Sequence, residues 1–463
     1  MSKWLRYLLI LAITLLGTAE VYWFTKTSDL SANLLSASSV RNLQSLSREY
    51  AIEEVAELFP GQELSPLSNF FLQTNIFKKV STSLSEFKEE PTLQFQGQYI
   101  PNRLIFKIGN KPLENVFLAK LDEADTDQIL EKAAQEFKVK IKELVFAEPD
   151  RLVLFEQPTV SSTCRPNSKN LRQLGIKTTL KRVLRQSNST PQLVKVAVID
   201  TGLAPNSELQ KIVALNQFEK KGQTYLDDDN NTYIDDINGW NFPENDPDAT
   251  DKQGHGTHVI GILKRVVSAT GANFNAFPLK AISERFGSIS DIARALKYAA
   301  DNDFKIANLS FGIYAPSNLL KEATSFADQH QVLLVAAAGN NNDTIPAYPA
   351  FYPEVLSVAA VDQNNQKSPK SNYGDWVKLV APGVNIRSNH LNNSYKCISG
   401  TSQAAPHITA LAIILKSYFP ALTNTQVRQI LLDSAKPLAN ELGAGIPQLD
   451  QAIKLARQIM KTK

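Results

Sequence analysis

The chain has 463 residues, of which 43% are hydrophobic and 21% are charged. This length allows two or three domains, and the composition is that of a globular protein with a substantial core. Lysine and arginine together number 49 and aspartate and glutamate 46, which gives a net charge of +3. So balanced a charge argues against nucleic acid as a partner.

The first 24 residues have the pattern of an export signal. Two basic residues precede an apolar run at 8–16, and small residues at 17–19 offer a site for a signal peptidase. An uncleaved membrane anchor is the alternative, because residues 21–24 prolong the apolar stretch, although Glu20 interrupts it and favours cleavage. Either way the rest of the chain is expected outside the cytoplasm, secreted, periplasmic or in the cell envelope. A membrane is a partner only if the segment stays uncleaved.

Residues 25–93 carry no chemical motif, although helical spacing predicts a helix at 41–59. Residues 94–157 predict a small α+β domain, with strands at 103–109, 138–146 and 151–155 and a helix at 127–137. Residues 158–169 are rich in Ser, Thr and Pro and predict an exposed linker.

From residue 170 to residue 463, strand and helix patterns alternate. Strands are expected at 194–200, 274–280, 304–310, 332–338, 355–361 and 377–381, and helices at 257–267, 290–301 and 318–329. Apolar strands separated by helices predict a parallel sheet with helices on both faces. The fold class is therefore α/β.

Three motifs carry the residue types of nucleophilic catalysis. Asp200 ends a Val- and Ile-rich strand, the end at which open α/β sheets place their sites. His255 lies between two glycines at a helix start, and imidazole is the usual proton acceptor near neutral pH. Ser402 follows a small-residue turn and opens an apolar helix, whose positive end favours developing negative charge. Together they predict a serine hydrolase.

A fourth motif, Ala-Ala-Ala-Gly-Asn340, ends a buried strand, and the Asn340 amide can donate a hydrogen bond to an oxyanion. Each motif also has an ordinary alternative. Asp200 and Asn340 suit turns, and His255 with His258 has the spacing of a metal pair. The chain has five histidines and no acidic ligand arranged as in a zinc helix, which argues against the metal pair.

In this order, the motifs resemble those of the subtilisin-like serine proteases, the subtilases. The resemblance runs from about Leu171 to the C-terminal helix and includes Val-Ala-Val-Ile-Asp-Thr-Gly, Gly-His-Gly-Thr-His-Val and Gly-Thr-Ser-Gln-Ala-Ala-Pro-His. It implies an exported serine endopeptidase, made as a zymogen, that acts on proteins or peptides through an acyl-enzyme. It also implies Ser402 as the nucleophile, His255 as general base and then acid, Asp200 as its orienting partner, and Asn340 as an oxyanion donor.

The resemblance further implies two edges between which a peptide adds as a strand. Gly287 and Ser288 match one edge, Ser310, Phe311 and Gly312 match the other, and Ala337, Ala338 and Gly339 wall a side-chain pocket. The α+β domain at 94–157 has the position of the family's propeptide, which makes the chain's own propeptide a partner. Gln403 replaces the commoner Met beside the nucleophile.

Residues 227–236 resemble a calcium loop of some subtilases, with Asp227, Asp229, Asn231 and Asp236 as ligands of a structural ion. The chemistry itself is expected to need no cofactor. Thr232 stands where an EF-hand loop has glycine, and no glutamate closes the loop, so a solvated acidic turn is the alternative.

Two other functions fit parts of the pattern. A catalytically silent subtilase-fold binding protein usually lacks a member of the triad, and none is missing here. An esterase or lipase usually carries Gly-x-Ser-x-Gly, whereas this chain has Gly400-Thr-Ser-Gln-Ala.

The two cysteines, Cys164 and Cys397, are too few for a disulfide scaffold. By the resemblance, self-cleavage is expected within 158–168, which contains Cys164, and Cys397 lies five residues before Ser402. A bridge between the two cysteines in the zymogen and two unpaired, buried thiols are both open.

Overall fold

The chain divides into two compact units, an N-terminal unit (residues 1–84 and 95–150) and a C-terminal unit (85–94 and 151–463). In the computed structural model, the described residues are 35, 37–50, 52, 54–58, 67, 71, 79–81, 99–108, 112–113, 116–121, 127–141, 144–154, 159–160, 164, 169–176, 190–206, 208–284, 286–438 and 442–461. The signal-like segment at 1–24 lies outside them. Among the described residues, no helix has the length and apolar character needed to cross a membrane.

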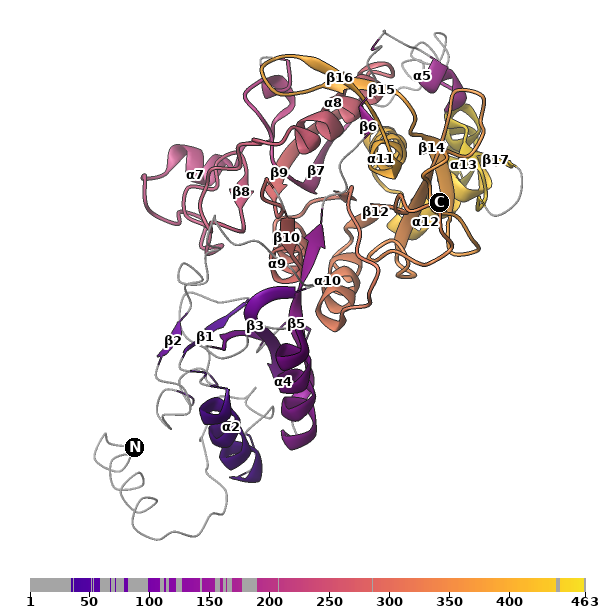
Figure 1. Cartoon of the computed structure of the whole chain (residues 1–463). Coiled ribbons are helices and arrows are strands. Elements are labelled where there is room, and N and C mark those ends of the chain that lie inside the picture. The colour runs from indigo at the N-terminus through magenta and orange to yellow at the C-terminus, as the bar shows by residue number, and fades with distance from the viewer. Residues whose placement is uncertain are drawn as a thin grey trace, which may run out of the picture. The chain divides into compact units, whose positions relative to one another are not determined.

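In the part of the N-terminal unit that the structure describes, a sheet is combined with the helices α2 and α4 (Figure 1). Its strands run β3-β4-β1-β2, with the first part of β5 beside β3. The elements are α2 (Ala37–Glu49), β1 (Glu54–Glu57), β2 (Lys79–Ser81), β3 (Tyr99–Ile108), β4 (Val116–Lys120), α4 (Asp127–Lys140) and β5 (Leu144–Leu154). Phe106 packs at the centre, with its ring centroid 5.2 Å from that of Phe117 and 5.6 Å from that of Phe137. The compact unit thus also takes in elements before residue 94.

Two sequence predictions in this unit are wrong. The strand expected at 138–146 begins only at Leu144, because α4 continues to Lys140, whose Nζ lies 2.7 Å from Glu136 Oε2 one turn earlier. The helix expected at 41–59 ends at Glu49. Residues after it form β1, where Val55 pairs with Ala119 of β4. Long-range strand pairing overrides the local helical spacing.

The C-terminal unit is built on a seven-stranded sheet in the order β14-β13-β12-β11-β7-β9-β8, and every neighbouring pair is parallel. The strands are β7 (Leu193–Asp200), β8 (Trp240–Asn241), β9 (Asn273–Lys280), β11 (Ile306–Leu309), β12 (Leu333–Ala337), β13 (Val355–Val361) and β14 (Leu379–Pro382). All seven residues of β13 are buried, as expected for a parallel strand covered on both faces. The predicted α/β class is confirmed.

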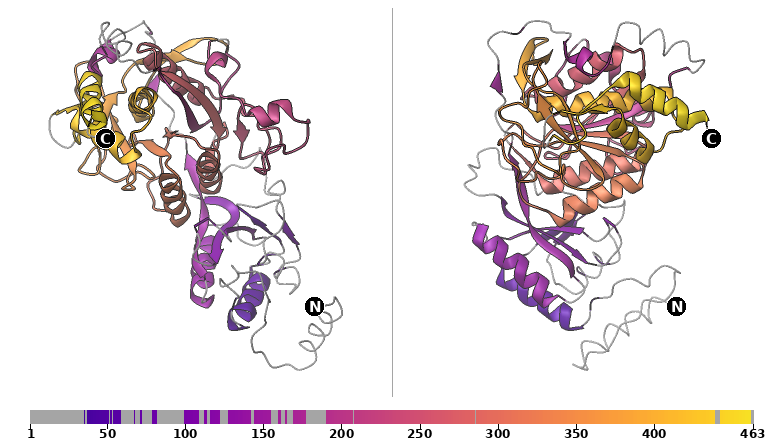
Figure 2. Two further views of the ribbon diagram at one scale, coloured as in Figure 1. Left: turned by 180° about the vertical axis from the view of Figure 1, so that it is seen from behind. Right: turned by 90° about the vertical axis from the view of Figure 1, so that its right-hand side faces the viewer.

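Helices cover both faces of this sheet (Figures 1 and 2). Helices α8 (His255–Ser268) and α11 (Thr401–Tyr418) pack together on one face, and α9 (Ile289–Asp301) and α10 (Asn318–Gln329) on the other. From β7 the chain crosses to β9 through α8, and from β9 it returns past β7 to β11 through α9. This reversal makes the carboxyl end of β7 a topological switch point, where open α/β sheets place their sites.

Smaller elements complete the unit. They are β6 (Thr159–Val160), α5 (Lys169–Gln173), η2 (Gln210–Ile212), α7 (Gln217–Lys221), β10 (Phe286–Ser288), β15 (Ile386–Asn389), β16 (Tyr395–Ser399), α12 (Asn424–Asp433), β17 (Ala435–Lys436), β18 (Ile446–Pro447) and α13 (Leu449–Lys461). Strands β15, β16 and β6 form a small antiparallel sheet. A disulfide joins Cys164 to Cys397, which is the first of the two states that the sequence left open.

Candidate active site

Asp200 and His255 lie side by side at the switch point. Asp200 is the last residue of β7 and His255 is the first of α8. Nδ1 of His255 lies 2.7 Å from Oδ1 of Asp200, and both side chains are buried. A carboxylate at this distance accepts a hydrogen bond from Nδ1–H, which keeps the proton on Nδ1 and leaves the lone pair on Nε2. The pair therefore presents a proton acceptor.

Asp251, which no sequence motif singles out, ties the two motifs together. Its Oδ1 accepts a hydrogen bond from Thr201 Oγ1 at 3.0 Å, and its Oδ2 accepts two from Thr257, from N at 3.0 Å and from Oγ1 at 2.7 Å. Thr201 Oγ1 in turn accepts from the N–H of Gly256 at 2.9 Å. This 2%-exposed carboxylate thus fixes the loop after β7 against the first turn of α8. The only local signal is an aspartate four residues before His255, in an ordinary turn.

Ser402 is the second residue of α11, whose first turn lies against the imidazole. The helix begins at Thr401, so the Ser402 N–H belongs to the group of first-turn donors that have no partner within the helix. The next residue, Gln403, places its Nε2 3.5 Å from Nε2 of His255. The structure thus brings the start of α11 to the proton-accepting edge of His255.

A buried hydroxyl holds the backbone of Ser402. Pro406 lies inside α11 and has no N–H, so it cannot make the helical hydrogen bond to the Ser402 carbonyl four residues earlier. Ser310 Oγ donates to that carbonyl instead, at 3.0 Å. Ser310 is itself held by Asn308 Nδ2 at 2.8 Å, and Asn308 Oδ1 accepts from Thr409 Oγ1 at 2.8 Å. The Ser310 side chain therefore supports the backbone of Ser402.

Asn340 lies beside the same helix start. Its Oδ1 accepts hydrogen bonds from the N–H of Thr401 at 2.8 Å and from its hydroxyl at 3.1 Å. A Cβ added to Gly400 would lie 3.0 Å from Gln403 Oε1, so the tight contact at this glycine is with Gln403. The two hydrogen bonds to Asn340 Oδ1 fix which way the amide faces, and its Nδ2 can donate to a ligand.

The two expected substrate edges are β10 and the residues that follow β11. Gly287 and Ser288 belong to β10, which pairs antiparallel with the end of β5 at Leu152–Leu154. The Ser288 side chain faces inward instead, where its oxygen accepts from the N–H of Asp291 and caps α9. On the other edge, Phe311 is buried, and a Cβ added to Gly312 would touch Ala347 at 3.3 Å.

The expected pocket wall lies at the end of β12. Ala337 is the last residue of the strand, and the N–H of Ala338 donates to Val358 O of the neighbouring β13 at 3.0 Å. Gly339 has φ of 99°, a left-handed conformation that suits glycine, and its N–H donates to Thr401 Oγ1 at 3.1 Å. The wall is thus tied to the first turn of α11.

The acidic loop at 227–236 brings carboxylates together, and Glu219, which the sequence did not suggest, lies among them. Carboxylate oxygens of Glu219, Asp227 and Asp229 lie within 4.8 Å of one another, and Glu219 belongs to α7. Oδ1 of Asp229 is buried and has no hydrogen-bond partner among the described residues. Three convergent carboxylates with an unsatisfied oxygen are the donor set that suits Ca²⁺. The sequence missed Glu219 because it lies eight residues before the loop.

The other two predicted ligands interact with each other. Asn231 Nδ2 donates to Asp236 Oδ2 at 2.9 Å and to Asp229 Oδ2 at 3.2 Å. Asp236 also accepts from Tyr298 Oη and from Asn216 Nδ2. Burial, opposed in part by these hydrogen bonds, raises the pKa of Asp236 to about 7.

His258 lies one turn after His255 but faces a different surface. Its Nε2 lies 3.0 Å from Ile386 O and 3.2 Å from Lys396 O, so it donates to the β15–β16 hairpin. Burial lowers the pKa of His258 to about 3, which keeps the ring neutral at neutral pH. The two histidines therefore do not converge on a metal.

Comparison with known proteins agrees with this arrangement. Residues 192–450 match the Subtilase family. Subtilisin BL of Lederbergia lenta is 33% identical over 269 residues, which cover 56% of this chain and 91% of that protein. An alkaline protease of Alkalihalobacillus alcalophilus is equally similar over 269 residues, but the match spans 64% of its length. Fervidolysin from Fervidobacterium pennivorans, described as a keratinolytic enzyme related to subtilisin, superposes with a TM-score of 0.61.

The fervidolysin match covers 78% of this chain and 62% of that one at 21% identity, and it shows the fold alone. The family match covers more than half of the chain and contains all four motifs, from Asp200 to Ser402. The resemblance read from the sequence is thereby confirmed: the chain belongs to the subtilase family.

Proposed function

We propose that this chain is a serine endopeptidase that cleaves proteins or peptides outside the cytoplasm. The observation that carries the proposal is the buried Asp200–His255 pair, 2.7 Å apart, which faces the first turn of the helix that bears Ser402. Membership of the subtilase family supports it.

In the proposed reaction, Ser402 Oγ attacks the carbonyl carbon of the scissile bond while His255 Nε2 takes the hydroxyl proton. Asp200 stabilises the imidazolium that forms. The developing oxyanion accepts hydrogen bonds from Asn340 Nδ2 and from the Ser402 N–H. His255 then gives its proton to the leaving amine, and water hydrolyses the acyl-enzyme by the same route in reverse.

A fluorophosphonate probe tests this proposal against a silent binding protein of the same fold. Ser402 should be labelled in the wild type but not in His255→Ala, because only an activated serine reacts with the probe. Esterase chemistry is tested by comparing turnover of matched amide and ester substrates. A labelled enzyme that turns over only the ester would contradict the assignment as a peptidase.

Replacing Asn340 with alanine should lower kcat by about 10²–10³-fold, the loss known for subtilisin when one oxyanion donor is removed. KM should change little, because the donor acts mainly on the transition state. Steady-state kinetics on a peptide substrate measures both. The exposed neighbour Asn341 provides the control, since Asn341→Ala should keep full activity. A rise in KM without loss of kcat would show that Asn340 only binds substrate.

The proposed zymogen consists of the N-terminal unit followed by the C-terminal unit. The pairing of Leu152–Leu154 with β10 supports it. These residues end the expected propeptide, and they pair with the strand to which a substrate would add. We expect the purified Ser402→Ala protein to keep its full unprocessed length.

The acidic loop is proposed to hold a structural Ca²⁺ through Glu219, Asp227 and Asp229, with Asn231 and Asp236 bridged to them. Saturating calcium should raise the Tm by about 5 °C at a concentration near 100 times Kd, because an ion that binds only the folded state stabilises it. Thermal melts with calcium and with chelator measure this shift.

Asp229→Asn should remove the calcium-dependent shift, because Asp229 supplies the unsatisfied oxygen. Asp228→Asn is the matched control, since the Asp228 carboxylate turns away to accept from the N–H of Gln223 at 2.8 Å. If the Tm of the wild type changed with neither calcium nor chelator, the loop would be an acidic turn that binds no ion.

A further inference from the structure

Residues 152–160, near the start of the main part of the C-terminal unit, pair with the strands β10 and β16. Leu152–Leu154 pair with β10, and Thr159 and Val160 pair with Ser399 and Ile398 of β16. Strand β16 ends three residues before Ser402. Because β10 receives the earlier residues and β16 the later ones, a substrate bound in the same direction has its acyl part on β10 and its leaving part on β16.

A disulfide fastens this stretch to β16. Cys164 is bonded to Cys397, and their Cα atoms are 5.2 Å apart although 233 residues separate them in sequence. Cys397 adjoins Ile398, the partner of Val160, so covalent bond and strand pairing join the same two pieces of chain. A ladder of two residues binds weakly by itself. A covalent link this short holds the segment at a local concentration of about millimolar.

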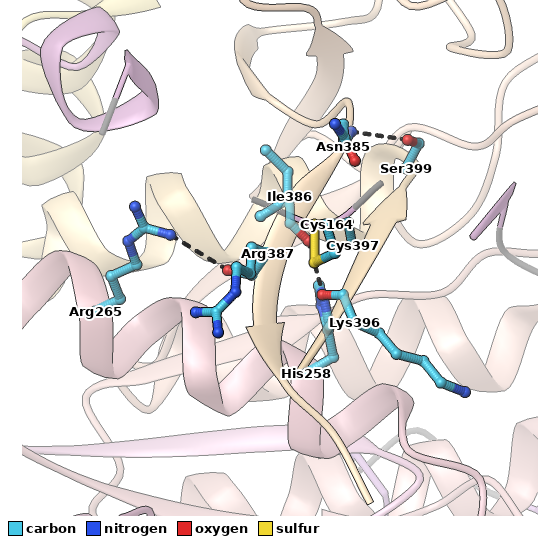
Figure 3. The surroundings of a disulfide bond; sticks show 9 residues. All are labelled: Cys164, His258, Arg265, Asn385, Ile386, Arg387, Lys396, Cys397 and Ser399. Carbon is cyan, nitrogen blue, oxygen red and sulfur yellow. Dashed lines mark hydrogen bonds between the residues drawn. A yellow bond between two sulfur atoms is a disulfide. The ribbon is translucent and has the colours of Figure 1, made fainter. Parts of the chain in front are cut away.

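The β15–β16 hairpin, which contains Cys397, is hydrogen-bonded to α8, the helix that begins with the proposed general base His255 (Figure 3). His258 Nε2 donates to Ile386 O and Lys396 O, so it holds both strands of the β15–β16 hairpin. Ser388 Oγ donates to His258 O at 2.7 Å. The hairpin is therefore tied to α8 one turn after His255 and does not depend on the disulfide for its position.

We propose that the segment carrying Cys164 stays on the leaving-group side after the propeptide is cut off, and that it inhibits the processed enzyme until the disulfide is reduced. This rests on the proposed peptidase function. The cut lies among the five peptide bonds from Leu154 to Thr159, which is upstream of most of the 158–168 window that the sequence predicts. The new N-terminus then lies just before β6 in the sequence, and the disulfide of Cys164 attaches this segment to β16 at a second point besides the main chain.

Reduction needs a dithiol from outside the protein. Its thiolate attacks the sulfur of Cys164, because Cys164 is partly exposed whereas Cys397 is only 1% exposed. The S–S bond breaks, Cys397 leaves as a thiolate that takes up a proton, and the second thiol resolves the mixed disulfide. Two electrons pass from the dithiol to the protein, giving a cyclic disulfide and two cysteine thiols. An oxidising compartment lacks such a donor in quantity, so the tether persists there.

The test uses the full chain after it has processed itself. An internally quenched peptide with several residues on both sides of the cut bond is assayed before and after dithiothreitol treatment. We expect reduction to lower KM by up to about tenfold with kcat unchanged, because the segment then loses its link to β16 and is held only by the main chain that follows Cys164. A p-nitroanilide substrate lacks residues on the leaving side and should respond much less. The chain has two cysteines, so no second disulfide within it can respond.

The Cys164→Ser variant should show the low KM without any reductant and should not respond to dithiothreitol. Reduced wild type capped with iodoacetamide makes the same comparison without a substitution. Before reduction, mass spectrometry should find the new N-terminal peptide linked to the peptide that contains Cys397.

Equal KM in oxidised, reduced and Cys164→Ser enzyme would overturn the inference while leaving the peptidase function standing. A mature N-terminus after residue 164 would overturn it as well. Absence of peptide cleavage in every form, together with no fluorophosphonate labelling of Ser402, would instead refute the proposed function and the inference with it.

Discussion

Replacing Ser402 with alanine is expected to lower kcat for peptide hydrolysis by about 10⁶-fold, the loss known for subtilisin without its nucleophile. Without Oγ there is no atom to form the acyl-enzyme. The fold should persist, because Ser402 contacts Ser310 through its backbone carbonyl, which alanine keeps. Steady-state kinetics on a quenched peptide and a thermal melt of the same preparation measure both quantities.

Ser417→Ala is the matched control, since it makes the same change in the last turn of the same helix. Ser417 Oγ donates to Gln192 O at 2.8 Å and accepts from the N–H of Asn273 at 2.9 Å. Losing this buried hydroxyl should lower the Tm but leave kcat within about threefold. A Ser402→Ala enzyme that still cleaves peptide at the wild-type rate would remove Ser402 from the mechanism.

The sequence predicts the C-terminal unit well because its strands are buried on both faces. Strands such as β7 and β13 read as nearly unbroken apolar runs, and α8, α9 and α10 show helical spacing. The N-terminal unit is predicted less well. Strand β1 exists through its pairing with β4, which comes about 60 residues later, and local spacing does not record that pairing.

In the candidate site, too, some residues can be predicted from the sequence and others cannot. Asp200, His255, Asn340 and Ser402 are readable because their chemistry requires particular side chains beside glycines and strand ends. Their supports are not readable. Asp251 acts through neighbours brought together by the fold, and Ser310 matters because Pro406, nearly a hundred residues later, leaves the Ser402 carbonyl without its helical donor. The Cys164–Cys397 bond likewise follows from the pairing of β6 with β16, which two cysteines in a sequence do not reveal.

Replacing Asp200 with asparagine is expected to lower kcat by about 10⁴-fold, the loss known when the triad acid of a serine protease becomes an amide. The carboxylate Oδ1 lies 2.7 Å from Nδ1 of His255 and holds the proton there. An amide at this place can turn its NH₂ toward the ring, which favours the tautomer with the proton on Nε2. That nitrogen then has no lone pair to take the Ser402 proton. KM should change little, because Asp200 is fully buried and does not face the substrate edges.

Asp291→Asn provides the control, because Asp291 is another buried carboxylate of the same unit, paired with Arg294 at 3.2 Å. Losing this carboxylate should lower the Tm, because the buried Arg294 guanidinium loses its charged partner, and should leave kcat within about threefold. Kinetics at a temperature below the Tm of both variants separate a loss of catalytic rate from a loss of folded protein. If Asp200→Asn lost activity only in proportion to its loss of folded protein, Asp200 would be a structural acid. A fall in kcat of four orders of magnitude in a fully folded enzyme instead requires that Asp200 sets which nitrogen of His255 carries the proton.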